Sequence, residues 1–263
     1  GGERLCTVDY GDLPPPYNRA VVTLPNVAHH AILDAIHTQP AVTLWYGTSF
    51  VGLLRENGRV VGLTAKREDE EIMVRAKAVV GADGAFSKVR ESLGIPADVH
   101  LYPQGYLIAI IEAPVPIDEA KYFVGKRTIL ALFPAAGRRV FLLYMIDAGS
   151  YDRVKAQGIP SLQRAWTAIS PPDEPIFQGL TDWSQTAFLP TGRVRTPTWV
   201  ADGAVLIGDA AHAMNPHASQ GRMQAMVDAV TLADLLPDCL AANDCSAERL
   251  KQFERLRRPQ VTV

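Results

Sequence analysis

The chain has 263 residues and a formal net charge of −2, with Lys and Arg scattered along it, so nothing favours a nucleic-acid partner. Hydrophobic residues make up 48% of the chain and charged residues 21%, the ordinary balance of a soluble protein with a substantial core. No apolar run approaches the ~20 residues that cross a bilayer, so no membrane span is predicted.

The three cysteines, Cys6, Cys239 and Cys245, show no paired metal-ligand spacing and cannot form an even set of disulfides. We therefore expect free thiols, no metal site and a reducing compartment, which places the protein in the cytoplasm. The sequence does not predict an oligomeric state.

In the first part of the chain, the sequence pattern predicts a loop-rich start, one helix and a β-meander. Asn26 is a candidate N-cap for a helix that ends near Thr38. Asn57-Gly58 is the signal of a tight hairpin between two of the strands. Strands are expected at residues 4–8, 49–55, 60–65 and 72–74.

The middle of the chain begins with a short apolar run at 78–80, as expected for a strand buried on both faces. The periodicity then changes to that of an antiparallel sheet, followed by a helix at 151–169 that breaks around Gly158 and Pro160. The antiparallel strands are expected at 106–112, 128–133, 140–146 and 186–195.

The last part returns to a buried strand at 204–207, followed by helices at 219–236 and 247–257. The expected organisation is an α/β domain formed by 1–100 and 196–263. An antiparallel sheet domain, 101–195, is inserted into it.

The first candidate site lies in the run GDAAHAMNPHASQGR, which begins at Gly208. Gly208 lets the backbone turn without a Cβ clash, and Asp209 then lies at the carboxyl end of a strand, where open α/β sheets bind ligands. A carboxylate only accepts hydrogen bonds, so its natural partners are hydroxyls such as those of a ribose or ribityl chain. Gly221 lies near a helix start, whose free N–H groups favour an anion. The alternative is a turn and N-cap with no ligand.

The second candidate site is the run GADGAFSKVR, in which Gly81 and Gly84 flank Asp83 at another strand end. Arg90 follows six residues after Gly84, where a guanidinium can make a forked contact with phosphate. The alternative is a turn followed by a surface helix with an exposed arginine.

Both runs resemble motifs of a known family. VVGADGAFSKVR looks like the second dinucleotide motif of the flavin-dependent aromatic hydroxylases related to p-hydroxybenzoate hydroxylase. VLIGDAAHAMNPHASQGRMQAMVDAVTLADLL is similar to the third motif of that family, in which a GDAAH run leads through a Pro to a Gly-Gln-Gly helix start and an Asp-Ala pair. The resemblance implies an α/β, Rossmann-like FAD/NAD(P)-binding domain with an inserted antiparallel β-sheet substrate domain.

The resemblance also implies roles for the two loops. Asp209, after Gly208, would bind the ribityl chain of FAD, and the segment from Pro216 through Ser219, Gln220 and Gly221 would lie beside the isoalloxazine ring. The loop from Gly81 to Gly84, with Asp83 and with Arg90 in support, would serve the pyrophosphate of FAD and the reductant NAD(P)H. The reduced flavin would take up O2 as a C4a-hydroperoxide and hydroxylate an aromatic or polycyclic small molecule.

The sequence departs from the family at three points. Ser219 stands where the family usually has the first Gly of Gly-Gln-Gly, and so adds a side chain where the backbone approaches the flavin. Met223 stands where it usually has Asn. No G-x-G-x-x-G occurs in the chain, although in the family this unit holds the ADP end of FAD. We therefore expect a core fragment of a larger protein, a truncated homologue or an incompletely represented sequence.

Two other functions remain open: a flavoprotein of the same fold with halogenase or reductase chemistry, and a non-catalytic remnant that only binds ligand. Two histidines, His212 and His217, lie within the run of the first site. His212 is expected to be structural, and His217 is the better candidate of the two for lining a pocket.

Overall fold

The computed structural model describes residues 2–114, 116–216 and 219–261. The chain forms two compact units, one of Gly1–Thr43 and Tyr102–Pro190, the other of Leu44–Leu101 and Thr191–Val263. The expected domain boundaries put residues 1–100 together, whereas the structure groups residues 1–43 with the antiparallel part. Residues 2–23 are exposed throughout, so this segment is held by few packing contacts.

The start of the first unit differs from the prediction in two details. The strand expected at 4–8 is absent from the described residues, and a short 3-10 helix at Tyr10–Asp12 follows instead. The helix α1, Pro25–His37, begins one residue before the predicted cap. Pro25 occupies the first turn, where a missing N–H costs nothing, so Asn26 lies inside the helix and does not cap it.

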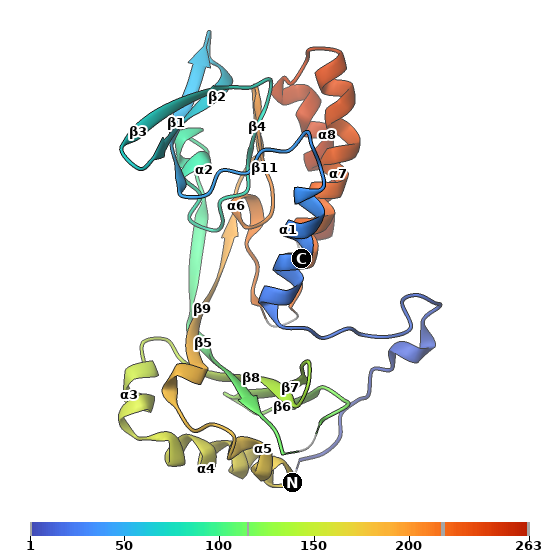
Figure 1. The fold of residues 1–263 in the computed structure, drawn as a ribbon, viewed down its shortest axis with the longest axis vertical. Helices are drawn as coiled ribbons and strands as arrows, with labels where there is room; N and C mark the ends of the chain where they lie inside the picture. The colour runs from blue at the N-terminus through green and yellow to red at the C-terminus, as the bar shows by residue number, and fades with distance from the viewer. Residues whose placement is uncertain (1, 115, 217–218, 262–263) are drawn as a thin grey trace. The chain divides into compact units, whose positions relative to one another are not determined.

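The first unit is built on a five-stranded sheet with the order β6-β7-β8-β5-β9, its pairs β5–β8, β6–β7 and β7–β8 antiparallel (Figure 1). The four predicted strands are confirmed, and β6 was missed because its four residues are too few to show an alternating pattern. The strands are β5 Asp98–Glu112, β6 Lys121–Val124, β7 Ile129–Pro134, β8 Arg139–Asp147 and β9 Thr186–Arg195.

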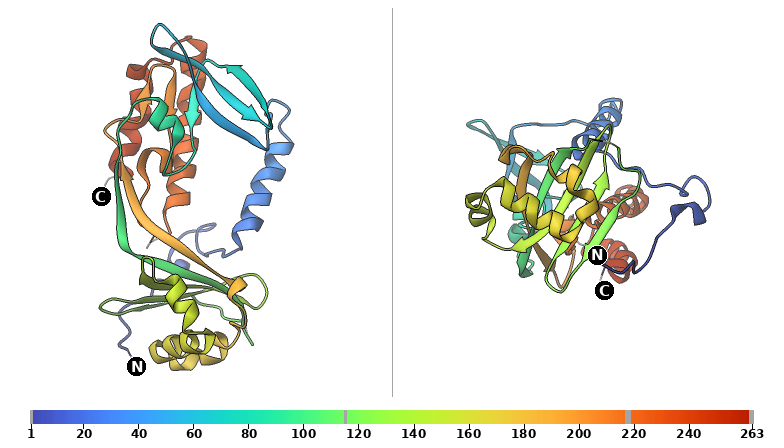
Figure 2. Two further views of the ribbon diagram at one scale, coloured as in Figure 1. Left: turned by 90° about the vertical axis from the view of Figure 1, so that its left-hand side faces the viewer. Right: turned by 90° about the horizontal axis from the view of Figure 1, so that it is seen from below.

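Helices cover one face of this sheet (Figure 2). The predicted break in the helical segment is confirmed at Gly158, which has a φ of 83° and precedes Pro160. Trp166 and Phe177 pack from the helices against buried sheet residues such as Leu142. The helices are α3 Tyr151–Ala156, α4 Ile159–Ile169 and α5 Glu174–Phe177, with 3-10 turns at Pro171–Asp173 and Trp183–Gln185.

The second unit contains the predicted meander. Strands β1 Thr48–Glu56, β2 Arg59–Arg67 and β3 Glu70–Arg75 form an antiparallel sheet in chain order. Asn57 and Gly58 both have positive φ, 50° and 83°, as a two-residue primed hairpin turn requires.

A second sheet in this unit carries the candidate site. Its strands are β4 Val79–Gly81, β10 Val200–Ala201 and β11 Ala204–Leu206, in the order β10-β11-β4, with β11 parallel to β4. The expectation that the strand at 78–80 is buried on both faces is wrong, because Val80 is 40% exposed. Within the described residues β4 is an edge strand of this sheet, so the N–H and C=O groups on its outer side have no strand partner.

Four helices complete the second unit: α2 Lys88–Ser92, α6 Asp209–His212, α7 Gly221–Ala241 and α8 Ala247–Val261. The predicted end near residue 236 is wrong, because α7 continues through Pro237. Cys239 is fully buried in the core beside Leu232 and Phe253, and this burial offsets the hydrogen bond that Pro237 cannot donate. No helix in the described ranges is long and apolar enough to cross a membrane.

Candidate functional site

The two predicted loops leave the same edge of one sheet. Strands β4 and β11 run parallel with Leu206 opposite Gly81, and the N–H of Ile207 donates to the Gly81 carbonyl at 3.0 Å. The loops that follow Gly81 and Ile207 therefore emerge side by side at the carboxyl ends of the strands, the edge where such sheets bind ligands.

The first loop is a capped turn into α2. The Asp83 carboxylate accepts hydrogen bonds from the Ser87 hydroxyl at 2.5 Å and from the Val89 N–H at 3.1 Å. Ser87 in turn accepts the Arg90 N–H at 2.9 Å and is the N-cap of the helix. Gly84, with a φ of 86°, supplies the left-handed residue that closes the turn. Asp83 is thus occupied in shaping the loop.

Arg90 lies inside the protein, not on its surface. Its side chain is buried, and Nη1 donates to the Ala210 carbonyl at 2.8 Å while Nη2 donates to the Ala85 carbonyl at 2.9 Å. The sequence suggested a phosphate contact for this guanidinium, or an exposed arginine. The geometry favours a positioning role, in which Arg90 joins the first loop to the second.

The second loop turns sharply at Gly208, whose φ of 56° and ψ of −142° suit glycine. A Cβ at this position would also lie 3.0 Å from the Ala225 side chain. The next residue, Asp209, opens the short helix α6 with its side chain exposed. A Cβ on Gly221 would lie 4.0 Å from Asp209 Oδ1, so this carboxylate is directed toward the start of α7.

The start of α7 is suited to an electron-rich group. The first N–H groups of any α-helix lack intrahelical acceptors, and the N-cap residue Gln220 makes no side-chain capping bond here. The 21-residue helix adds the positive end of its dipole at Gly221. An exposed acid that accepts from hydroxyls therefore lies beside amides that attract negative charge, the two properties needed to hold the ribityl chain and the ring of a flavin.

The segment before α7 shows why the family usually has glycine at the position of Ser219. Ser219 has a positive φ of 54°, a left-handed conformation that glycine adopts without strain, and its N–H donates to the Pro216 carbonyl at 2.9 Å. The glycine that the family usually has here therefore meets a backbone requirement. His217 lies outside the described residues.

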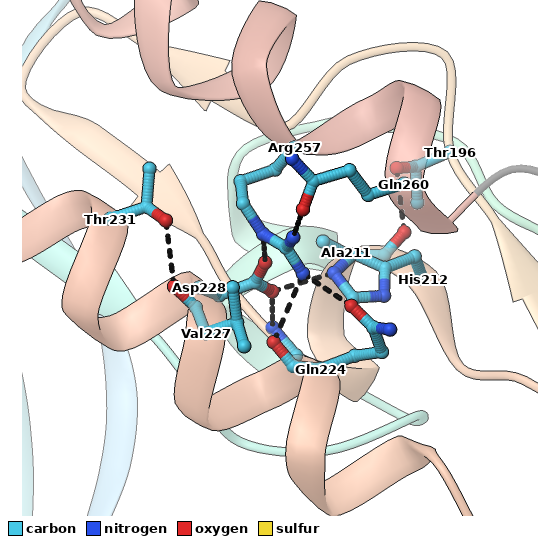
Figure 3. A network of polar contacts seen from close by, with 10 residues as sticks. Thr196, Ala211, His212, Gln224, Val227, Asp228, Thr231, Arg257 and Gln260 are labelled. Atoms are coloured by element: carbon cyan, nitrogen blue, oxygen red, sulfur yellow. Dashed lines mark hydrogen bonds and ion pairs between the residues drawn. The ribbon is translucent and has the colours of Figure 1, made fainter. Parts of the chain in front are cut away.

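Behind the loop lies a buried network centred on Asp228 of α7 (Figure 3). Asp228 Oδ2 accepts the Gly208 N–H at 2.8 Å and lies 2.6 Å from His212 Nε2, while Oδ1 accepts from Arg257 Nε of α8 at 2.7 Å. Burial raises the pKa of the Asp228 carboxyl, but the hydrogen bonds from His212, Arg257 and Gly208 lower it by more, so its pKa lies below the ordinary value. His212 is buried in this network, and the structural role expected for it stays a prediction.

Sequence reasoning missed Asp228 and Arg257 as members of the site. Asp228 was quoted only as part of the Asp-Ala pair of the third motif, and Arg257 lies 29 residues further along the chain. The sequence signal for this pair is an acid at a helix position that faces the core, followed by an arginine on the next helix. It becomes specific only when the fold brings the two helices together.

A cavity of about 500 Å³ lies elsewhere, in the first unit, between the end of β8 and helices α3 and α4. Its lining includes Tyr144 and Leu162 together with Arg127 and Arg153. None of the predicted cofactor-site residues lines it.

Comparison with known proteins identifies the class. A family described as an FAD binding domain matches residues 16–262. The chain is 31% identical to 6-methylpretetramide 4-monooxygenase of Streptomyces rimosus over 99% of the chain and 62% of that protein. It is 28% identical to digeranylgeranylglycerophospholipid reductase of Methanocella arvoryzae over 79% of the chain and 52% of that protein. PqsL of Pseudomonas aeruginosa, solved with 2-aminobenzoylacetate, matches with a TM-score of 0.82 at 21% identity over 96% of the chain and 69% of PqsL.

The chain belongs to the FAD binding domain family, the class of the flavin-dependent aromatic hydroxylases that its two motifs resemble. The likeness to PqsL supports the α/β FAD-binding fold with antiparallel sheets. The chain spans only 62% and 52% of the two named relatives' own lengths.

Proposed function

We propose that the protein is an FAD-dependent monooxygenase that hydroxylates an aromatic or polycyclic small molecule. The observation that carries this proposal is the exposed Asp209 carboxylate directed toward the start of α7. The resemblance of both loops to the motifs of flavin hydroxylases supports it, as does the similarity to a named monooxygenase over nearly the whole chain.

The second loop holds the cofactor in this proposal. Asp209 would accept hydrogen bonds from the ribityl hydroxyls, and the first amides of α7, at Gly221, would favour negative charge on the ring. Pro216, Ser219 and Gln220 would lie beside the flavin ring.

The first loop lies toward the pyrophosphate. Gly84, which has open space beside it, would let the backbone approach the phosphates, whereas Gly81 lets Leu206 and Val89 pack closely. Asp83 holds the shape of the loop through the α2 cap. Arg90 fixes its distance from the second loop through Ala210.

Bound FAD supplies the transfer of two electrons from NAD(P)H to O2, so that one oxygen atom enters the substrate and the other leaves as water. The chain's own residues would position the cofactor. Asp209 and the α7 amides would orient the flavin, and the helix dipole would favour negative charge beside Gly221.

The substrate contacts the aromatic face of the five-stranded sheet in this proposal. Tyr122, Phe133 and Phe141 form a run of edge and tilted ring contacts, with centroids 5.3 Å and 6.2 Å apart. They alternate with residues buried against the helices, such as Leu142, and so lie on the opposite face. Burial raises the pKa of Tyr106 on this face, and neighbouring Tyr122 adds to the effect, so its phenol stays neutral. Such a face suits a flat, apolar ring.

The test is to add FAD and NAD(P)H and measure cofactor oxidation together with oxygen uptake across aromatic and polycyclic compounds. A monooxygenase shows both, and both increase with the right substrate. A yellow protein that oxidises no NAD(P)H would favour halogenase or reductase chemistry, the latter also represented among its relatives. A colourless protein that still binds ligand would favour a non-catalytic remnant.

A further inference from the structure

We propose that Asp228 and His212 form a positioning pair for the cofactor loop, in which a neutral His212 carries its proton on Nε2 and neither residue touches the cofactor. The inference rests on the proposed FAD site, since it assigns the residues that hold Asp209 in place.

A single carboxylate oxygen holds both ends of the short helix that carries Asp209. Asp228 Oδ2 accepts the Gly208 N–H, just before α6, at 2.8 Å, and it lies 2.6 Å from Nε2 of His212, the last residue of α6. The Gly208 carbonyl accepts the N–H groups of Ala211 and His212, each at 2.9 Å. Asp209 therefore sits between two points that Asp228 fixes, which sets the direction of its backbone.

The charge of Asp228 is balanced without His212. Arg257 is 1% exposed and donates to Oδ1, and its other nitrogens donate to the backbone carbonyl and side-chain oxygen of Gln224 at 3.3 Å and 2.6 Å. Oδ2 of this charge-balanced carboxylate accepts the Gly208 N–H and has a further lone pair for a neutral donor, so it does not need a second positive charge. A neutral imidazole supplies this donor at Nε2.

The other imidazole nitrogen points to the same protonation state. His212 Nδ1 is buried and has no hydrogen-bond partner among the described residues. A protonated imidazole would place a buried N–H at Nδ1 without an acceptor, which is costly. The charged groups nearby pair with each other: Arg258 lies over the Trp199 ring that packs on His212, and it bonds Glu254. They leave no net charge to stabilise an imidazolium.

Three substitutions and one control separate positioning from general stability. His212→Gln keeps an N–H near the position of Nε2 but cannot be charged, and His212→Phe keeps a ring but loses the donor. Asp228→Asn replaces one carboxylate oxygen with an NH2 group, so it keeps a single acceptor oxygen, and it leaves Arg257 without an ionic partner. Leu232→Ala, a buried core residue on the same helix, destabilises the fold without touching the network.

For each variant we would measure FAD affinity by fluorescence quenching, thermal stability, and hydrogen exchange at the Gly208 amide. The ¹⁵N shifts of His212 would be recorded in the wild type without FAD. We expect the Nε2–H tautomer, near wild-type FAD affinity for His212→Gln, and affinity weakened roughly tenfold or more for His212→Phe and Asp228→Asn, with faster Gly208 exchange. Leu232→Ala should lower the melting temperature and keep the affinity.

The positioning role is overturned if the Gly208 amide exchanges faster in His212→Phe while this variant binds FAD as the wild type does. It is also overturned if Leu232→Ala loses as much FAD affinity as His212→Phe. An Nδ1–H or doubly protonated His212 overturns the assigned protonation state. A wild type that binds no FAD, with the expected tautomer and exchange, contradicts the proposed function and the flavin-directed role but leaves the pair itself in place. The outcomes are therefore distinguishable.

Discussion

Arg90 Nη1 lies 2.8 Å from the carbonyl oxygen of Ala210, a hydrogen bond across 120 positions of sequence. The bond joins the loop after β4 to the loop after β11, so the two motif loops behave as one structural element. It also explains why an arginine six residues after Gly84 is buried: its role is to hold the spacing of the two loops.

Replacing Arg90 should therefore weaken the fold locally. Arg90→Ala leaves the carbonyls of Ala210 and Ala85 without their donor, at a cost of about 1–3 kcal/mol in the free energy of unfolding. Arg90→Lys should recover only part of this, because an ammonium lacks the planar fork that reaches both carbonyls. Denaturant unfolding measures the effect, and the exposed Arg164→Ala serves as control, within about 0.5 kcal/mol of wild type. An Arg90→Ala protein as stable as this control would show that the bridge contributes nothing.

Ser219→Gly should be neutral or stabilising, by about 0–1 kcal/mol. A left-handed residue with a side chain costs roughly 1–2 kcal/mol, and the greater freedom of glycine in the unfolded chain returns about 0.5–1 kcal/mol of that. The matched control is Ser161→Gly inside α4, which should destabilise by about 0.5 kcal/mol because its backbone is helical. In thermal unfolding, Ser219→Gly should keep or raise the melting temperature, and Ser161→Gly should lower it. A loss of stability in Ser219→Gly equal to that of the control would contradict the assigned conformation.

The contribution of Asp228 to the free energy of unfolding should depend on pH. Because its pKa is depressed in the folded state, its contribution is fully present above the unfolded value of about 3.9 and is lost as pH falls through the lower folded value. At neutral pH, Asp228→Asn should cost about 3–5 kcal/mol, since Arg257 is left buried without its partner.

The stability gap between wild type and Asp228→Asn should therefore narrow as pH falls below 4. Urea unfolding at a series of pH values measures this gap. The exposed Asp69→Asn is the charge-matched control and should follow the wild type throughout. A gap that stays constant from neutral to acid pH would mean that the Asp228 carboxyl is not held ionised by its partners.

Local patterns predicted most of the fold. Asn57-Gly58 specified its hairpin, Gly158 broke its helix, and the apolar run at 204–207 became β11, because turn chemistry and periodicity act over a few neighbouring residues. The end of α7 was missed because packing around Cys239 outweighs the local signal of Pro237. The exposure of Val80 depends on what lies beside β4, which no local pattern contains.

The candidate site was predictable to a similar degree. Asp209 and Gly221 were identified from a strand end and a helix start, and the structure brings them together. The environments of Asp83 and Arg90 were not predictable, because the partners Ser87 and Ala210 depend on how two loops meet in space. Arg257 joins the site only through helix packing.

The most direct test of the account is the FAD affinity of Asp209→Ala against the wild type, measured by fluorescence quenching on folded protein. Loss of the carboxylate leaves ribityl hydroxyls without their acceptor, at about 1–3 kcal/mol per group, so affinity should fall roughly tenfold or more. The exposed Asp69→Ala, which also removes one negative charge, should bind FAD as the wild type does. Wild-type affinity in a folded Asp209→Ala protein would contradict the assignment of this loop as the flavin site.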